Sequence, residues 1–196
     1  MEIVTYGHPC LRRKAKPLTE ITPELRRTVR TMFELMYEAR GIGLAATQVG
    51  LPYRFFVINP TADRNEGDEE MVFINPEIVR RKGNAVGEEG CLSLPELYGD
   101  VPRASEIVVE AFDLDGQGFE VTCSELMARV ILHENDHLDG VLFIDRMDDE
   151  ARSELDANLD DLLRQFRQKQ TDGKYGSDAD IEKQLDEMEQ SFEFPE

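Results

Sequence analysis

The sequence predicts a domain that contains both helices and antiparallel strands, followed by an acidic, helical C-terminal extension. Three features of the 196-residue chain lead to this prediction. Two apolar runs separated by Asp115-Gly116 are typical of an antiparallel hairpin, and residues 124–138 have apolar side chains at helical spacing. The last 49 residues are strongly acidic. Because a chain of this length buries a core of its own, we expect a body, residues 1–147, and a tail, residues 148–196.

The first helix is predicted over residues 23–39. Thr22 is a good N-cap, Pro23 suits the first helical position, and Gly41 is expected to end the helix. Apolar side chains recur at helical spacing within it, namely Leu25, Val29, Met32, Phe33, Met36 and Tyr37.

Strands are predicted where short apolar runs lie between polar segments. Residues 55–59 and 71–75 form one pair, joined by a polar loop, and residues 106–113 and 118–123 form the hairpin. Residues 141–145, reading VLFID, are expected to add one more strand.

The helix over residues 124–138 carries two of the chain's three histidines. On a helical wheel of about 100° per residue, His133, Glu134 and His137 share one face. Two imidazoles so placed can bind one metal ion while the carboxylate stands beside its open side. The alternative is a helix whose two histidines are hydrogen-bonded or exposed. The expected cap residues are Ser124 and Gly140, and the apolar residues on the histidine face are Leu126 and Val130.

A catalytic metal site needs a third protein ligand. Cys91, in the run GEEGCLSLP at residues 87–95, is the best candidate because thiolates bind borderline divalent metals strongly. Otherwise a lone cysteine is an inert small hydrophobe. His8 is expected in a surface or turn role, and a carboxylate of the tail is another possible third ligand.

The run GIGLAATQVG, residues 41–50, places one amide, Gln48, among small and apolar neighbours. Its small residues allow close backbone packing. It is either a site residue or a surface polar residue in a helix-to-strand connection.

The net charge of −19 argues against a general binder of nucleic acid or anionic membranes. No run approaches 18 apolar residues, and the N-terminus has no apolar signal segment. The cysteines, Cys10, Cys91 and Cys123, are too few and too widely spaced for a disulfide scaffold, which favours a reducing, cytosolic compartment.

Residues 148–196 hold 16 acidic and 6 basic residues, so −10 of the net charge lies in the tail. Residues 171–178 separate two amphipathic helices. Their apolar residues are Ala151, Leu155, Leu159, Leu162, Leu163 and Phe166 in the first, and Ile181, Leu185, Met188 and Phe192 in the second. The tail is expected to fold back on the body, to pair with a second copy of the chain, or to be disordered.

Taken in order, three motifs resemble those of the peptide deformylase family. They are Gly41–Gln48 (GIGLAATQ), Glu89–Ser93 (EGCLS) and His133–Leu138 (HENDHL). The opening GHPCL, residues 7–11, is also similar, and the resemblance covers roughly residues 3–147. It implies an α+β fold, with antiparallel sheets packed around the helix that carries the HExxH motif. It also implies removal of the N-formyl group from the formyl-methionine of new proteins, releasing formate.

The resemblance implies a role for each motif residue. Cys91, His133 and His137 would bind one divalent metal ion, Fe²⁺ in the cell and Zn²⁺ or Ni²⁺ as alternatives. Glu134 would move the proton of the attacking water to the leaving amine. The side-chain amide of Gln48 and the backbone N–H of Leu92 would stabilise the oxyanion.

The resemblance also implies a substrate pocket and partners. Ile42, Leu126 and Val130 would hold the methionine side chain, and the backbone near Gly43 and Gly90 would bind the extended nascent peptide. Glu89 and Arg103 would form a structural ion pair. The expected location is the bacterial cytoplasm or an organelle matrix, with transient proximity to the ribosome but no basic anchor in the tail.

Two positions depart from the family's pattern: Thr47 replaces a common proline and Leu132 a common glutamine. Neither is a proposed ligand, so we expect altered packing and unchanged chemistry. Two other functions are compatible with the HExxH motif. One is a metalloprotease whose third ligand is an acid of the tail. The other is a non-enzymatic domain with a structural zinc site formed by Cys91, Cys123, His133 and His137.

Overall fold

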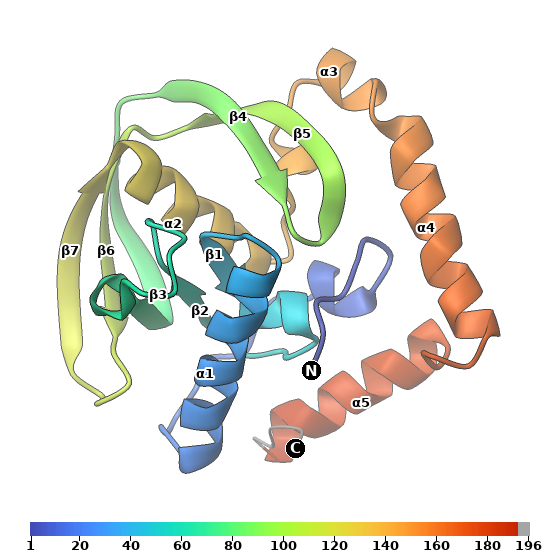
Figure 1. The fold of residues 1–196 in the computed structure, drawn as a ribbon, viewed down its shortest axis with the longest axis horizontal. Coiled ribbons are helices and arrows are strands. Elements are labelled where there is room, and N and C mark those ends of the chain that lie inside the picture. The colour runs from blue at the N-terminus through green and yellow to red at the C-terminus, as the bar shows by residue number, and fades with distance from the viewer. Residues whose placement is uncertain (192–196) are drawn as a thin grey trace.

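The computed structural model describes residues 1–191 of the chain. Its strands precede its central helix, and three helices follow (Figure 1). The strands are β1 (Gly43–Ala45), β2 (Phe55–Ile58), β3 (Met71–Lys82), β4 (Ala85–Cys91), β5 (Leu94–Arg103), β6 (Glu106–Phe112) and β7 (Gly118–Ser124). The helices are α1 (Pro23–Glu38), α2 (Glu125–Leu138), α3 (Asp149–Ser153), α4 (Asp156–Thr171) and α5 (Asp178–Ser191). The expected α+β fold with antiparallel sheets and a helical C-terminal extension is confirmed.

Seven strands form two separate antiparallel sheets. Five of them pair in the order β1-β2-β3-β6-β7, and β4 pairs only with β5. Helix α2 packs on the larger sheet and faces the β4–β5 hairpin with its other side. The two histidines of α2 therefore lie between the sheets.

Strand β2 shows how the apolar sequence builds two cores. All four of its residues are buried, and alternate side chains point to opposite faces of the sheet. Phe55 and Val57 join the core beneath α1, whereas Phe56 and Ile58 join the core beneath α2. The site helix is thereby held on a sheet that is covered on both faces.

Most predicted boundaries of the body agree with the structure. Helix α1 begins after Thr22, whose hydroxyl accepts a hydrogen bond from the Leu25 N–H. The left-handed residue at its end is Arg40, with φ of 59°, one residue before the expected Gly41. Ser124 occupies the N-cap position of α2, but its side chain makes no capping hydrogen bond.

Two expectations about local structure were wrong. Residues 141–145 are not a strand, because Phe143–Asp145 forms a turn of 3-10 helix in which the Asp145 carboxylate accepts the Leu142 N–H at 2.8 Å. For His8 only the surface role was wrong: the residue lies in the expected turn, where it begins the 3-10 helix Pro9–Arg12 and its Nδ1 accepts the Cys10 N–H, but it is only 7% exposed.

The tail helices lie along the body, with α4 on one side and α5 returning beneath the N-terminal segment (Figure 1). Phe166 of α4 is fully buried and would clash with any Cβ at Gly7. Helix α5 buries Ile181 and Leu185, whereas Phe192, expected on the same helix, lies outside the described residues. Within residues 1–191, no helix combines the length and apolar character that crossing a membrane requires.

Candidate metal centre

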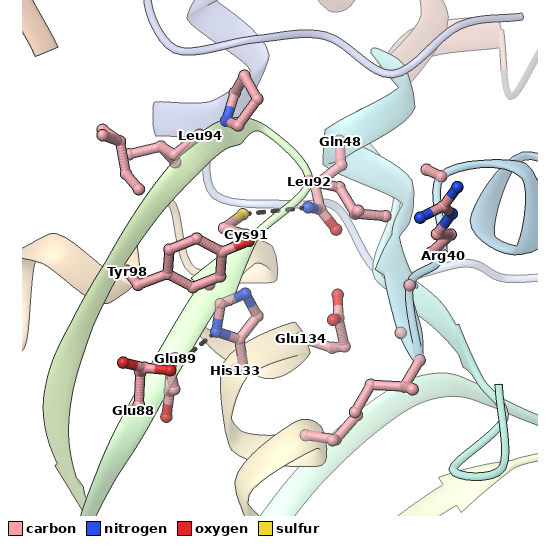
Figure 2. Close-up of a pocket in the computed structure, with 18 of the residues that line it drawn as sticks. Arg40, Gln48, Glu88, Glu89, Cys91, Leu92, Leu94, Tyr98, His133 and Glu134 are labelled. Carbon is pink, nitrogen blue, oxygen red and sulfur yellow. Dashed lines mark hydrogen bonds and ion pairs between the residues drawn. The ribbon is translucent and has the colours of Figure 1, made fainter. Parts of the chain in front are cut away.

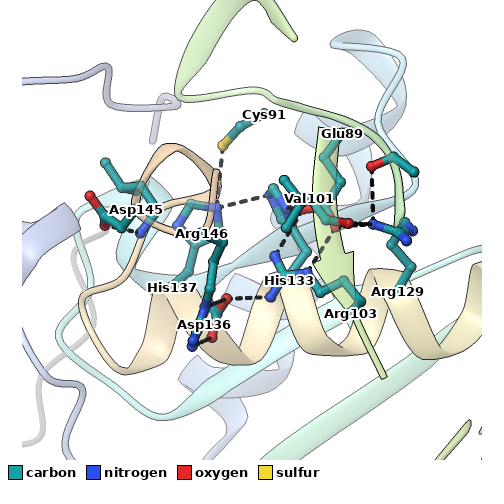
Figure 3. A network of polar contacts seen from close by, with 12 residues as sticks. Glu89, Cys91, Val101, Arg103, Arg129, His133, Asp136, His137, Asp145 and Arg146 are labelled. Atoms are coloured by element: carbon teal, nitrogen blue, oxygen red, sulfur yellow. Dashed lines mark hydrogen bonds and ion pairs between the residues drawn. The ribbon is translucent and has the colours of Figure 1, made fainter. Parts of the chain in front are cut away.

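Three metal-binding side chains meet where the β4–β5 hairpin faces α2. Cys91 is the last residue of β4, and His133 and His137 lie on consecutive turns of α2. The Nε2 atom of His137 is 3.2 Å from both Cys91 Sγ and His133 Nε2, and all three donor atoms lie within 4.8 Å of one another (Figure 3). The structure thus brings together the three ligands suggested by the sequence.

The spacing of these donors suits one tetrahedral metal ion. Bonds of about 2.0–2.3 Å to nitrogen and sulfur place neighbouring ligands of a tetrahedral ion about 3.3–3.6 Å apart. The two donor–donor distances of 3.2 Å are close to that value. One thiolate and two imidazoles also form a donor set that Zn²⁺ and Fe²⁺ accept. The residues therefore fit a divalent metal.

His133 is oriented by a buried carboxylate behind it. Its Nδ1 lies 2.9 Å from Glu89 Oε2, and Arg103 donates to both oxygens of Glu89 at 2.8 Å. Burial alone would raise the pKa of Glu89, but hydrogen bonds from Arg103 and His133 outweigh it and lower that pKa to about 2. The ionised Glu89 leaves His133 Nε2 facing the other donors.

Asp136, inside the HENDH motif, faces away from the donors. It binds Arg103 in a buried ion pair and also accepts two hydrogen bonds from Arg146, at 3.0 and 2.7 Å (Figure 3). Glu89, Arg103 and Asp136 thus form one charge network beneath the histidines. Arg146 joins this network to the segment that leads into the tail.

Glu134 lies beside the three donors and is not one of them. It is buried, and its Oε2 has no hydrogen-bond partner among the described residues. A Cβ at Gly43 would fall on its carboxylate, so Gly43 provides the space that the carboxylate occupies. Burial raises the pKa of Glu134 to about 7. A carboxyl group with that pKa can both accept and donate a proton near neutral pH.

Gln48 is buried and directs its amide at the same site. It is 1% exposed, which excludes the surface role considered for it. Its Oε1 accepts the Ala45 N–H at 2.8 Å, and its Nε2 lies 3.4 Å from Ser93 Oγ. The same Nε2 lies 3.4 Å from Cys91 Sγ (Figure 2). Thr47, the first of the two unusual residues, donates to the His137 carbonyl at 3.2 Å.

A cleft with a volume of about 650 Å³ opens onto these residues (Figure 2). Its lining includes most of the residues that the sequence suggested: Ile42, Gly43, Gln48, Gly90, Cys91, Leu92, Leu126, Val130, His133 and Glu134. Val130 is buried, whereas Leu126 is 53% exposed and therefore is not an ordinary core residue. An apolar side chain can enter between α2 and the segment that contains Ile42.

Sequence reasoning missed Arg129. Its guanidinium extends from α2 to the hairpin and binds Glu89 at 2.8 Å and the carbonyl of Val101 at 2.9 Å (Figure 3). The signal was present, because Arg129 lies one turn before His133 on the same helical face. A charged residue on a face that is otherwise apolar or metal-binding usually has a buried partner.

The residues required by the other two candidate functions lie elsewhere. Cys123 is buried in β7 within the core beneath α2 and is not part of the donor cluster. Within residues 1–191, no carboxylate of the tail joins that cluster either. Among residues 1–191, the arrangement therefore contains neither the closed zinc site nor a third ligand from the tail.

Comparison with known proteins agrees with this geometry. The family model for polypeptide deformylase matches residues 1–153. A peptide deformylase from Rhodopirellula baltica is 41% identical over 192 residues, which cover 98% of this chain and 95% of the relative. One from Acidobacterium capsulatum is 48% identical over 173 residues, covering 88% and 97%.

Solved structures of the same family also match. Arabidopsis thaliana peptide deformylase 1B, in complex with an inhibitor, superposes with a TM-score of 0.82 at 40% identity, over 86% of this chain and 93% of that one. The Thermus thermophilus enzyme gives a TM-score of 0.76 at 45% identity, over 83% and 95%. The match to the Rhodopirellula relative extends beyond residue 153 into the tail, which the family model does not cover.

Proposed function

The chain belongs to the peptide deformylase family, and from this membership we propose how its cleft removes the formyl group from formyl-methionine. The enzyme is a hydrolase, and its products are formate and a free α-amino group. The observation that carries the assignment of residues is the convergence of one thiol and two imidazoles beside a buried carboxylate.

Cys91, His133 and His137 hold one divalent metal ion in this proposal. A bound metal supplies a Lewis acid that lowers the pKa of water toward neutrality. The family is metal-dependent, and the donor set accepts both Fe²⁺ and Zn²⁺. From the family resemblance we propose Fe²⁺ as the ion in the cell, with Zn²⁺ and Ni²⁺ as alternatives. Glu89 and Arg103 keep the His133 ring in the orientation that binding requires.

Glu134 moves the proton. Its carboxylate accepts a proton from the attacking water and then donates it to the nitrogen of the leaving amine. Burial raises the pKa of Glu134, and its oxygen without a partner is available for the water. The small residue at Gly43 is needed because the carboxylate occupies the space of a side chain.

Gln48 and Leu92 stabilise the oxyanion. The Oε1 of Gln48 is already bound to the Ala45 N–H, so its NH₂ group is fixed toward the site. Leu92 follows Cys91 directly, and its backbone N–H is the second donor in this proposal. Loss of one such donor typically lowers the rate by about 10²–10³.

Ile42, Leu126 and Val130 hold the methionine side chain. These apolar residues line one part of the cleft, whereas Glu134 and the donors line another. The peptide beyond methionine extends along the backbone near Gly43 and Gly90, so its sequence is read weakly.

The partners are nascent formyl-methionyl peptides. Residues 1–147 form the catalytic metallohydrolase domain, and residues 148–196 form an acidic tail that is not an RNA anchor, because 16 acidic against 6 basic residues repel phosphate. A homodimer is the competing arrangement for the tail. The relatives are bacterial and chloroplastic, which supports the bacterial cytoplasm or an organelle matrix as the location.

The test is formate release by the freshly purified, Fe²⁺-loaded chain under anaerobic conditions, with formyl-Met-Ala-Ser as substrate. We expect turnover that stops when a chelator removes the metal. Cys91→Ser should abolish metal binding, whereas the matched Cys123→Ser should retain it. An intact substrate after incubation with the loaded protein contradicts the proposal, and loss of metal in both variants would favour the structural zinc site.

A further inference from the structure

The proposed metal ligands come from two parts of the fold that share no strand pairing. Cys91 belongs to the β4–β5 hairpin, whereas both histidines belong to α2, which packs on the five-stranded sheet. A metal ion tolerates errors of only about 0.2 Å in its ligand distances. Something other than sheet hydrogen bonds must therefore fix the hairpin against the helix.

Arg129 makes the most extensive tie between these parts. Its Nη1 donates to Gly87 O at 3.2 Å and to Val101 O at 2.9 Å, and its Nη2 donates to Ala85 O at 2.8 Å. One guanidinium from α2 thus binds the backbone of both hairpin strands. It also binds Glu89, the carboxylate that orients His133. The other polar ties join side chains to side chains, as in Arg103–Asp136 and His133–Glu89.

The absence of a side chain at Gly87 leaves room for this guanidinium. A Cβ added at Gly87 would lie 3.1 Å from Nη2 and 3.2 Å from Cζ of Arg129, which is tighter than ordinary contact. The Arg129 side chain is only 16% exposed, and its bonds to three carbonyls leave it little freedom to move away. The contact therefore fixes both the distance and the tilt of β4 at this point.

The tie lies where a small tilt has a large effect. Cys91 is four residues beyond Gly87, about 13 Å along the strand, so a tilt of 5° at Gly87 displaces the thiol by about 1 Å. Arg129 is one helical turn, about 6 Å, from His133. We propose that Arg129 is a positioning residue that aligns Cys91 with His133 and His137 before the metal binds. In this proposal Gly87 is required because it leaves room for the guanidinium.

The test measures metal affinity and does not depend on the deformylase reaction. The Kd for Zn²⁺ is determined by competition with a chelator for the full-length protein and its variants. Arg129→Met, which keeps a long stem and loses the guanidinium, should raise the Kd by about 10–100-fold, the range typical of groups that orient metal ligands. Gly87→Ala should raise it in the same direction but less.

Two matched controls isolate the effect. Arg26→Met removes an arginine of α1 that is paired with Asp115 at 3.3 Å, away from the cleft, and should leave the Kd unchanged. Gly118→Ala adds a Cβ in β7 where the nearest atom is 3.6 Å away. In the cobalt-substituted protein, the visible bands of tetrahedral coordination should weaken in Arg129→Met and persist in both controls.

A wild-type Kd in Arg129→Met overturns the inference, even if the thermal midpoint falls, because Arg129 would then be only a structural brace. If that variant does not fold, Arg129→Lys keeps the charge and loses the fork, and wild-type Kd values in both Arg129→Lys and Gly87→Ala have the same consequence. The inference rests on the proposed ligand set. If Cys91→Ser binds zinc normally, the proposed ligand set is wrong. If Cys91→Ser loses zinc binding but Arg129→Met keeps the wild-type Kd, the ligand set stands and only the positioning role of Arg129 is refuted.

Discussion

At the scale of single residues, one position along α2 separates the proposed metal ligand His133 from the proposed proton carrier Glu134. His133 directs its imidazole toward Cys91 and His137, whereas Glu134 turns by about 100° toward Gly43. The two adjacent side chains consequently have different surroundings. Two ionised groups accompany His133, namely Glu89 and Arg103, whereas burial without a hydrogen-bond partner for Oε2 raises the pKa of Glu134.

Glu134→Gln should retain the metal and lose most of the turnover. The amide has nearly the same shape as the carboxylate but cannot accept the water's proton, and general acid–base help is worth about 10²–10⁴-fold in rate. The measurement is kcat alongside metal content per chain. Glu88→Gln, which changes an exposed carboxylate on the rim of the same cleft, serves as the control and should keep its activity. If metal content falls together with activity, Glu134 is a ligand or a structural support.

His8 should make the protein sensitive to acid. It is buried against Phe166 and Tyr175 of the tail, and burial lowers its pKa to about 4, from 6.5 in the unfolded chain. Between pH 6.5 and 4, His8 is protonated in the unfolded state but stays neutral in the folded state, so the free energy of unfolding falls as the pH falls. At pH 5 the loss relative to neutral pH is about 2 kcal/mol.

His8→Asn tests this effect, because asparagine can still accept the Cys10 N–H and does not titrate in this range. The variant should be less stable at neutral pH, since it loses the ring contacts. Its free energy of unfolding, measured with urea, should fall less than the wild-type value between pH 7.5 and 5. An identical fall in both proteins would mean that His8 does not titrate as described.

At the scale of elements, the helices, the site motifs and the β6–β7 hairpin could be predicted from the sequence, whereas the β4–β5 hairpin could not. Helix α2 has apolar residues at helical spacing and a glycine after its end, and Asp115-Gly116 marks the β6–β7 turn. Strands β4 and β5 contain few buried residues, and long-range bonds such as those of Arg129 and Arg103 hold them in place. A strand stabilised in that way leaves little apolar alternation in its sequence.

Residues 141–145 show that long-range contacts can also overturn a local preference for a strand. Its apolar, β-branched residues favour a strand, but the chain turns because Asp145 accepts the Leu142 N–H and pairs with Arg12. Arg12 is 133 residues away in the sequence. Local propensity cannot include a partner at that distance, so tertiary contacts override it.

The contacts of α5 explain part of the tail's acidity. Arg13 of the body binds three carboxylates of α5, namely Glu182, Asp186 and Glu189, which follow one face of the helix. Lys16 donates to the Glu189 carbonyl at 2.5 Å, and Tyr53 donates to the Met188 carbonyl at 2.7 Å. The sequence reveals the excess of negative charge, whereas the structure shows that part of it serves docking to the body.

At the scale of the whole molecule, the tail encloses the N-terminal segment. Its apolar stripe is buried: Leu159 and Leu162 join a core with Leu142 and Phe143, and Phe166 packs with Cys10, Ile181 and Leu185. The N-terminal segment in turn contacts the end of α2, where the Ala15 N–H donates to the Leu138 carbonyl at 2.8 Å. The described part of the tail, residues 148–191, therefore supports the helix that carries the site and contributes no residue to the lining of the cleft.

A chain that ends after Glu154 should lose stability and remain a monomer, and its pelleting with ribosomes should not be weaker than that of the full chain. Burial of each large apolar side chain contributes about 1.5–3 kcal/mol, so losing five of them removes much of a typical folding free energy. The midpoint of thermal unfolding should be clearly lower in the short chain, and the full-length Phe166→Ala variant should show a smaller decrease. Light scattering should give monomers for both lengths, and pelleting with ribosomes at low salt should not weaken. If the short chain pelleted more weakly while its stability and monomeric state were unchanged, the tail would be a docking element despite its charge.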